Sequence, residues 1–321
     1  MEKVPVGNVS VMSDLASMNK SERDVTFGHS SSNDTLILQT CEKAGELPVT
    51  SLGIIGNVLV LWVWQADSSF IPATFFIKYL ATCDLLFSAS TFVKIFDFMP
   101  VVVVSSFTTF FIKMSVHVTL ALAVSRCVAV YRPLRVTLIL SRRRVIVVSV
   151  VIACWCFLLQ GLQLCSRYVI LFGDDYDKRS ILAICFLFLS YCLPLLPMVG
   201  CNVALLCKVY RRDVTSHMSH DQARASRQQT RRLTLGVVCI TTTSVLAYPV
   251  IFSVITPIRW KQPAYLVTFN IIASCVSNLL IGINSSINVI YYVIFASEFR
   301  RLLVLRFTRL WGCCKRRYAG Y

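Results

Sequence analysis

The chain has 321 residues, of which 56% are hydrophobic and only 15% are charged. Soluble domains are about one quarter charged, so this deficit indicates apolar runs that cross a lipid bilayer, each about 20 residues long. The formal net charge of +16 would suggest nucleic acid as the partner of a soluble protein. In a membrane protein the basic residues instead mark one side of the bilayer, so we expect the lipid bilayer and no nucleic acid as a partner.

Residues 1–45 are polar and are predicted to form an extracellular N-terminal tail. Three N-x-S/T sequons begin at Asn8, Asn19 and Asn33. Because all three fall in one short tail on the side predicted below to be outside, we expect glycosylation of at least one of them.

Seven apolar segments follow, each near or above the length that spans a bilayer. Residues 297 to about 310 come next, with apolar side chains on one helical face and arginines among them, which predicts a short amphipathic helix on the membrane surface. The expected fold is an all-α membrane protein with a seven-transmembrane bundle over 46–294 and a cytoplasmic surface helix and tail over 295–321. The segments are 46–65, 72–97, 101–131, 145–165, 181–209, 231–257 and 264–294.

Basic residues are concentrated on one side of these segments. The loop after the third segment holds six of the 32 Lys and Arg residues, the loop after the fifth holds seven, and the C-terminal tail holds seven. The positive-inside rule then predicts an extracellular N-terminus and a cytoplasmic C-terminus. Only an odd number of spans satisfies this orientation, which supports the count of seven. We therefore expect a multi-pass protein of the plasma membrane.

Asp84 lies deep in the second segment, and charges within spans are functional candidates by default. Oxygen ligands around one carboxylate suit a hard cation or ordered water. The alternative is a polar cluster that merely holds helices together, and the two interpretations are compatible. The candidate partners are Asn57 in the first segment, Ser115 in the third, and Asn284, Ser285 and Asn288, which share one helical face of the seventh.

Arg126 ends the third segment on the predicted cytoplasmic side. It lies eleven residues after Ser115, close to three helical turns, so both side chains share a face. Taken alone, Arg126 would be an interfacial arginine that extends its charge into the headgroups. Its sequence surroundings favour a functional role instead.

With these residues in place, the chain resembles the rhodopsin-like (class A) G-protein-coupled receptors over all seven segments. Each matching motif is weak alone, but one per span in the right order is highly specific. The style of the Ser125–Arg135 stretch is similar to invertebrate orphan receptors of the chemosensory or peptide kind. The motifs are Gly56-Asn57-Val58, Leu80-Ala81-x-x-Asp84, Arg126 with the following Tyr131-Arg132-Pro133-Leu134, Trp155, Pro194, Pro249, and Asn288-x-x-x-Tyr292 followed by Phe299-Arg300-Arg301.

The resemblance implies roles for these residues. Arg126 and Tyr292 would engage the G protein or stabilise the open cytoplasmic face. Pro249 would be the pivot of the sixth span, with Pro194 of the fifth as a further part of the activation machinery. Cys313 and Cys314, just past the surface helix, are similar to palmitoylation sites. An allosteric sodium pocket is implied at Asp84, Ser115, Asn284, Ser285 and Asn288, braced by Asn57; no other metal and no cofactor is expected.

The chain departs from the family pattern at several switch positions. Ser125 replaces the acidic residue before the arginine, and Gln229 stands where some members carry an acid that clamps it. Without either ion pair to Arg126 the inactive state loses a clamp worth about 1–3 kcal/mol, which predicts raised basal signalling. Asn202 and Ala247 replace the tyrosine of span five and the aromatic switch of span six, and these losses would instead weaken activation. Both outcomes remain open at this point.

Four residues bear on the ligand. Thr108 occupies the position of the aspartate in amine receptors, and Gly282 that of the retinal lysine in opsins, so neither an amine nor retinal is expected. Lys94, near the outer end of span two, and Lys113, in span three, could each receive an acidic ligand group. Lys94 could equally extend to the outer surface, and Lys113 could pair internally.

The sequence therefore predicts a ligand-activated receptor for a peptide or a small non-amine chemical, with heterotrimeric G proteins as partners. The alternatives are a seven-helix transporter, although no internal repeat supports it, and a signalling-silent receptor-like scaffold. No nucleophile–base pair or metal-ligand set indicates an enzyme.

Overall fold

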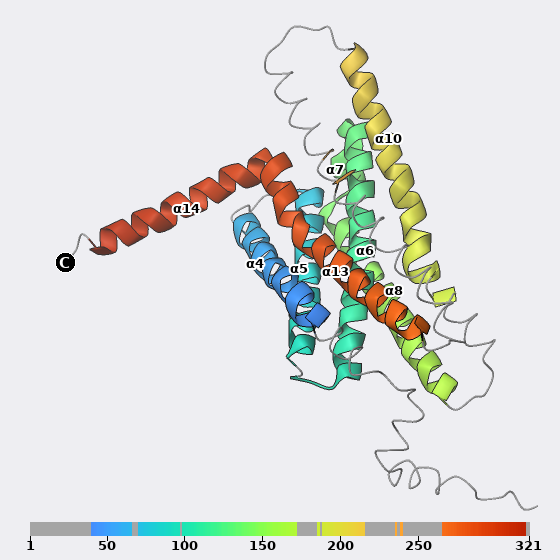
Figure 1. Cartoon of the computed structure of the whole chain (residues 1–321). Helices are drawn as coiled ribbons and strands as arrows, with labels where there is room; N and C mark the ends of the chain where they lie inside the picture. The colour runs from blue at the N-terminus through green and yellow to red at the C-terminus, as the bar shows by residue number, and fades with distance from the viewer. Residues whose placement is uncertain are drawn as a thin grey trace, which may run out of the picture.

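The computed structural model describes residues 40–65, 70–96, 98–171, 185–186, 188–215, 235, 238–239 and 265–318. Within these ranges the backbone forms helices and the turns that join them, with no strand. Figure 1 shows the long helices gathered side by side. The elements are η1 (Cys41–Glu46), α4 (Leu47–Trp64), α5 (Pro72–Ile95), α6 (Val101–Tyr131), η2 (Pro133–Arg135), α7 (Val136–Ile139), α8 (Arg142–Leu171), η3 (Phe188–Cys192), α10 (Leu193–Thr215), α13 (Tyr265–Phe295) and α14 (Ser297–Tyr318).

Six described helices are long and apolar enough to cross a membrane. They match the predicted first, second, third, fourth, fifth and seventh spans, although the fourth helix begins at Arg142 instead of 145 and runs on to Leu171. Nearly all of the predicted sixth span, 231–257, lies outside the described residues, and so do Pro249, Ala247 and Gln229. The six candidate spans are Ala44–Trp64, Pro72–Ile95, Val102–Tyr131, Arg142–Cys165, Phe188–Lys208 and Asn278–Phe295.

Prolines set several helix boundaries. Pro72 opens α5 after Ile71, whose backbone is extended at φ −111° and ψ 122°. A proline suits this first position because its missing N–H has no partner there anyway. Pro133 follows Arg132, which leaves the helical region at φ −131° and ψ 60° and so ends α6. A proline disfavours the α conformation at the residue before it, which explains why this long helix stops at Tyr131.

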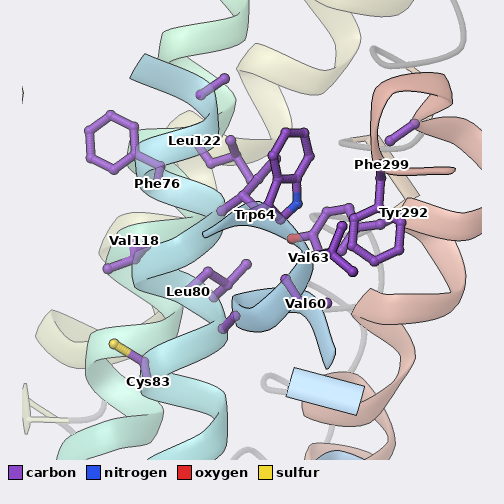
Figure 2. Packing of buried hydrophobic residues seen from close by; sticks show 14 of the residues in the cluster. Val60, Val63, Trp64, Phe76, Leu80, Cys83, Val118, Leu122, Tyr292 and Phe299 are labelled. Atoms are coloured by element: carbon purple, nitrogen blue, oxygen red, sulfur yellow. The ribbon is translucent and has the colours of Figure 1, made fainter. Parts of the chain in front are cut away.

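The bundle packs around α5, which lies against both α4 and α6; α4 also packs against α13, and α6 against α8 and α10. Gly53 and Gly56 bring α4 close to its neighbours, since a Cβ at Gly56 would lie 2.9 Å from Val289 Cγ1. Small residues of this kind allow close helix contact where no water drives association. Figure 2 shows the main core, to which Val60, Leu80, Val118, Leu122, Tyr292 and Phe299 contribute.

The outer faces of the helices are strongly apolar. Leu52 on α4, Phe157 on α8 and Leu196 on α10 are 62%, 73% and 67% exposed. Soluble monomers rarely show apolar surface on this scale. In a bilayer the same side chains contact lipid, so the burial pattern agrees with the hydropathy of the six candidate spans.

The helix α14 begins at Ser297, one residue after α13 ends, and Figure 1 shows it turning away from the bundle. Arg300 Nη1 donates to the carbonyls of Val293 and Ile294 at 3.0 and 2.6 Å, so it satisfies the C-terminal end of α13. Phe299 is fully buried beside Trp64 and Tyr292, at ring distances of 6.0 and 5.9 Å. The helix continues to Tyr318, so the prediction of an end near 310 was wrong. Cys313 and Cys314 lie within α14, not beyond it.

Candidate functional site

Asp84 is the centre of a buried polar cluster that joins α5, α6 and α13. Its side chain is 2% exposed. Ser115 Oγ donates to Asp84 Oδ1 at 2.8 Å, and Asn288 Nδ2 donates to Oδ2 at 2.7 Å. The helical register explains this meeting, because each polar residue falls on the interior face of an otherwise apolar helix. The structure thus brings Asp84, Ser115 and Asn288, three of the residues that the sequence singled out for a polar pocket, into direct contact.

A second layer of polar contacts surrounds the carboxylate. Ser285 Oγ donates to the backbone carbonyl of Asp84 at 3.2 Å and lies 3.5 Å from Ser88 Oγ. Asn57 Nδ2 donates to the carbonyls of Gly53 and Ser285 at 2.9 and 3.1 Å. Asn57 therefore braces α4 against α13 and does not contact the Asp84 carboxylate directly. Asn284 is buried at 5% exposure on α13, beside Ser285 in sequence.

The cluster has the chemistry of a hard-cation site. The side-chain groups that bond the Asp84 carboxylate are a hydroxyl and an amide, both of them neutral. Asn288 Oδ1 is buried and has no hydrogen-bond partner among the described residues. A buried carboxylate with neutral neighbours needs a cation or a proton, and an orphaned amide oxygen can serve as a further ligand. The residues present therefore fit the sodium ion that the resemblance implies.

Arg126 lies five residues before the end of α6, in the neighbourhood of Tyr292 of α13. Its Nε has no partner within the described ranges. Ser125 is buried at 3% exposure, and its Oγ donates to Leu122 O of the same helix at 2.7 Å. The hydroxyl therefore bonds its own helix, so Ser125 supplies no counter-charge to Arg126.

Tyr292 and Trp64 place further polar atoms near this end of the bundle. Both residues are buried, and neither Tyr292 Oη nor Trp64 Nε1 has a hydrogen-bond partner in the described part of the chain. Figure 2 shows these two atoms pointing toward each other. Tyr292 and Trp64 belong to the same hydrophobic core as Phe299, and each of them, like Arg126, holds a buried polar atom without a partner among the described residues.

The other activation residues fall partly inside the structure. Pro194 is buried near the start of α10. Asn202, which replaces the family tyrosine, is buried at 6% exposure on the same helix. Tyr131 Oη donates to Ala204 O at 2.8 Å, and Cys127 Sγ lies 3.4 Å from Cys201 O, so the C-terminal end of α6 is linked to α10.

The three predicted ligand contacts have different surroundings. Lys113 is 1% exposed, and its Nζ donates to Gln160 Oε1 at 2.8 Å and to Gln163 Oε1 at 2.5 Å on α8. Lys113 therefore pairs internally, which was one of the two sequence interpretations. Thr108 donates to Val104 O of its own helix at 2.9 Å. Lys94 is partly exposed near the end of α5.

Sequence reasoning missed two polar features. Gln160, 8% exposed, bonds both Lys113 and Thr109. Glu46, 3% exposed, accepts a hydrogen bond from Asn278 Nδ2 at 2.9 Å and so links the end of η1 to the middle of α13. Gln160 could have been found as a polar residue within an apolar segment. Glu46 could have been found as an acidic residue at the start of the first apolar segment.

Comparisons with known proteins address the fold and the relatives of the chain. No protein-family model matches the chain. A rhodopsin described as Gq-coupled, from Mizuhopecten yessoensis, is 24% identical over 307 residues, covering 82% of the chain and 58% of that relative. An FMRFamide receptor from Drosophila melanogaster is 29% identical over 126 residues, covering 38% of the chain and 21% of that receptor. The chain thus spans less than two thirds of these relatives' length.

Among solved structures, the crystal structure of squid rhodopsin superposes with a TM-score of 0.67 at 18% sequence identity, over 88% of each chain. This similarity shows the fold. Together with the two receptors it confirms the resemblance predicted from the ordered motifs, which is to divergent class A G-protein-coupled receptors.

Proposed function

We propose that the chain is a seven-span plasma-membrane receptor that activates heterotrimeric G proteins when an extracellular ligand binds. The carrying observation is the contact of Asp84 with both Ser115 and Asn288, which joins three helices through one buried carboxylate. Arg126 and Tyr292 lie on the cytoplasmic side of this cluster. A rearrangement of the buried cluster would therefore reach the residues that face the G protein.

Nucleotide exchange tests this function directly. The full chain, reconstituted in lipid nanodiscs, is mixed with a panel of purified heterotrimers, and GTP-analogue uptake is followed. Gq is the first member because one relative is described as Gq-coupled. We expect faster uptake with at least one heterotrimer and loss of this effect in Arg126→Leu. Uptake equal to that of empty nanodiscs for every heterotrimer, with and without tissue extract, would favour the silent scaffold or the transporter.

The ligand is proposed to be a diffusible peptide or small non-amine chemical. Gly282 packs against α4, where a Cβ would lie 3.0 Å from Val49 Cγ1, so this position holds neither the retinal lysine nor space for one. One relative is an FMRFamide receptor, so amidated peptides form the first ligand panel. A spectral band that appears when retinal is added to the purified chain would contradict this assignment.

Sodium would act as an allosteric ligand of the Asp84 cluster. When bound, the ion supplies the positive charge that neutral neighbours of the carboxylate lack. Asp84, Ser115 and Asn288 would hold it, while Asn57 and Ser285 keep α4, α5 and α13 in register through their backbone contacts. The ion would bind most tightly to the arrangement in which α5, α6 and α13 are held around Asp84. Sodium would therefore shift the equilibrium toward this arrangement, which we take to be the inactive one.

The proposed topology has residues 1–45 outside, the bundle over 46–294 and the C-terminal residues 295–321 inside. Glycosylation of Asn8, Asn19 or Asn33 would mark the outer side. Treatment with a glycosidase should then raise the gel mobility of the chain, and it should have no effect on a variant in which all three asparagines are replaced by Gln. On the inner side, α14 would lie on the membrane surface with Cys313 and Cys314 acylated. Hydroxylamine-sensitive acyl exchange, lost in the Cys313→Ser, Cys314→Ser double variant, checks this.

A further inference from the structure

A groove separate from the Asp84 cluster lies between α6, α7 and α10. Its volume is about 550 Å³, within the range of pockets that hold small organic groups. Apolar side chains make most of its lining, among them those of Ile139 on α7 and of Pro197 and Cys201 on α10. Since Ile139 belongs to the predicted second cytoplasmic loop, the groove opens in the cytoplasmic half of the bundle.

Gly200 leaves part of this groove empty. No heavy atom lies within 4 Å of a Cβ built at Gly200, whereas Gly53 and Gly56 on α4 have neighbours closer than 3.0 Å. The nearby helices are nevertheless joined, because Tyr131 bonds Ala204 O and Cys127 bonds Cys201 O. The groove is therefore an open channel between helices that are already in contact, and is not a gap produced by their separation.

Positive charge marks one end of the groove. Arg132 is exposed and belongs to its lining. Lys208 Nζ lies 5.5 Å from the ring centroid of Tyr131, another lining residue, in cation–π contact. No acidic residue contributes to the lining. An apolar channel with two cations at its rim is complementary to an anionic amphiphile.

We propose that this groove binds one acyl chain of an anionic phospholipid from the inner leaflet, with the lipid phosphate beside Arg132 and Lys208. The bilayer supplies this occupant at high local concentration, and the cytoplasmic leaflet carries the anionic lipids that basic residues attract. The assignment goes beyond the proposed receptor function and rests on its cytoplasmic orientation. A bound chain would hold α7 against α6 and α10, next to Arg126.

Lipid retention tests the proposal without any signalling readout. The full chain is placed in nanodiscs of phosphatidylcholine with phosphatidylserine, extracted in detergent, and its lipid adducts are counted by native mass spectrometry. We expect retained phosphatidylserine in preference to phosphatidylcholine. Gly200→Trp should remove most of the adduct because the indole fills the groove. Arg132→Gln should lower the phosphatidylserine preference about fivefold, as expected for one cation near a charged leaflet.

Gly161→Trp is the matched control, because a Cβ at Gly161 on α8 also meets no atom within 4 Å and Gly161 does not line the groove. It should retain lipid as the unchanged chain does. Equal adducts in Gly200→Trp and Gly161→Trp overturn the proposal, and so does equal retention of the two lipids. A dimer lost in Gly200→Trp assigns the groove to a second copy and also overturns it. If Gly200→Trp fails to fold, Arg132→Gln decides, since Arg132 is exposed and its replacement leaves the packing intact.

Discussion

Asn288 Nδ2 donates a hydrogen bond to Asp84 Oδ2 over 2.7 Å and joins two helices whose residues lie 204 positions apart in the chain. The same carboxylate accepts a hydrogen bond from Ser115 on a third helix. Any change in the charge of Asp84 therefore acts on α5, α6 and α13 together.

Sodium should stabilise the chain through Asp84. In detergent, we expect the chain to have a higher melting temperature in saturating NaCl than in choline chloride. The difference should be about 2–4 °C for each kcal/mol by which sodium binding stabilises the folded chain. Asp84→Asn should abolish the difference, because the carboxylate charge is lost. Ser88→Ala is the control, since Ser88 lies beside Ser285 and does not contact the carboxylate. Identical melting of the unchanged chain in both salts would rule out the sodium site.

Lys113→Met should destabilise the bundle. The substitution removes the hydrogen bonds that Lys113 Nζ donates to Gln160 Oε1 and Gln163 Oε1. An unsatisfied buried polar group costs about 1–3 kcal/mol, so thermal unfolding should begin several degrees lower. Lys94→Met, at a partly exposed position, should have a smaller effect. Unchanged stability of Lys113→Met together with reduced ligand potency would identify Lys113 as a ligand contact instead.

Ser125→Asp should lower basal nucleotide exchange. Ser125 now bonds its own helix, so an aspartate at this position supplies the missing counter-charge for Arg126. Coupling free energies of about 1–3 kcal/mol correspond to a decrease of about fivefold or more. Ser125→Ala should leave exchange unchanged. If the unchanged chain has no basal activity and Ser125→Asp has no effect, the changes at Asn202 and Ala247 dominate instead.

Gly53→Ala should loosen the contact between α4, α5 and α13. A Cβ at this position would lie 2.6 Å from Ser88 Oγ and 2.8 Å from Ser286 Oγ, so at least one serine must move. Overpacking of this kind costs about 1–3 kcal/mol. Gly161→Ala should keep or raise stability, because its Cβ would be in open space and alanine favours the helix. Equal melting temperatures of the two variants would contradict the packing.

Much of the helical architecture was predictable from sequence because bilayer-spanning segments leave a strong local signal. Apolar runs located six helices, and the spacing of Asn284, Ser285 and Asn288 placed them on one face. The end of α14 was missed, since helix ends at polar residues depend on weak propensities. The sequence could not decide whether Lys113 contacts a ligand or pairs internally, because its partners Gln160 and Gln163 lie 47 and 50 residues further along the chain.

The sequence by itself determined that the chain is an apolar helical protein, and it predicted that most basic residues lie on one side of the membrane, since hydropathy and charge are properties of short segments. It also supplied both side chains that bond the Asp84 carboxylate, Ser115 and Asn288. Only the tertiary structure decided which atoms meet: that Ser115 and Asn288 share the carboxylate, that Asn57 braces the backbone, and that Lys113 is held by α8. Contacts between distant segments depend on how helices pack, and helix packing is set by side-chain shape across the whole bundle.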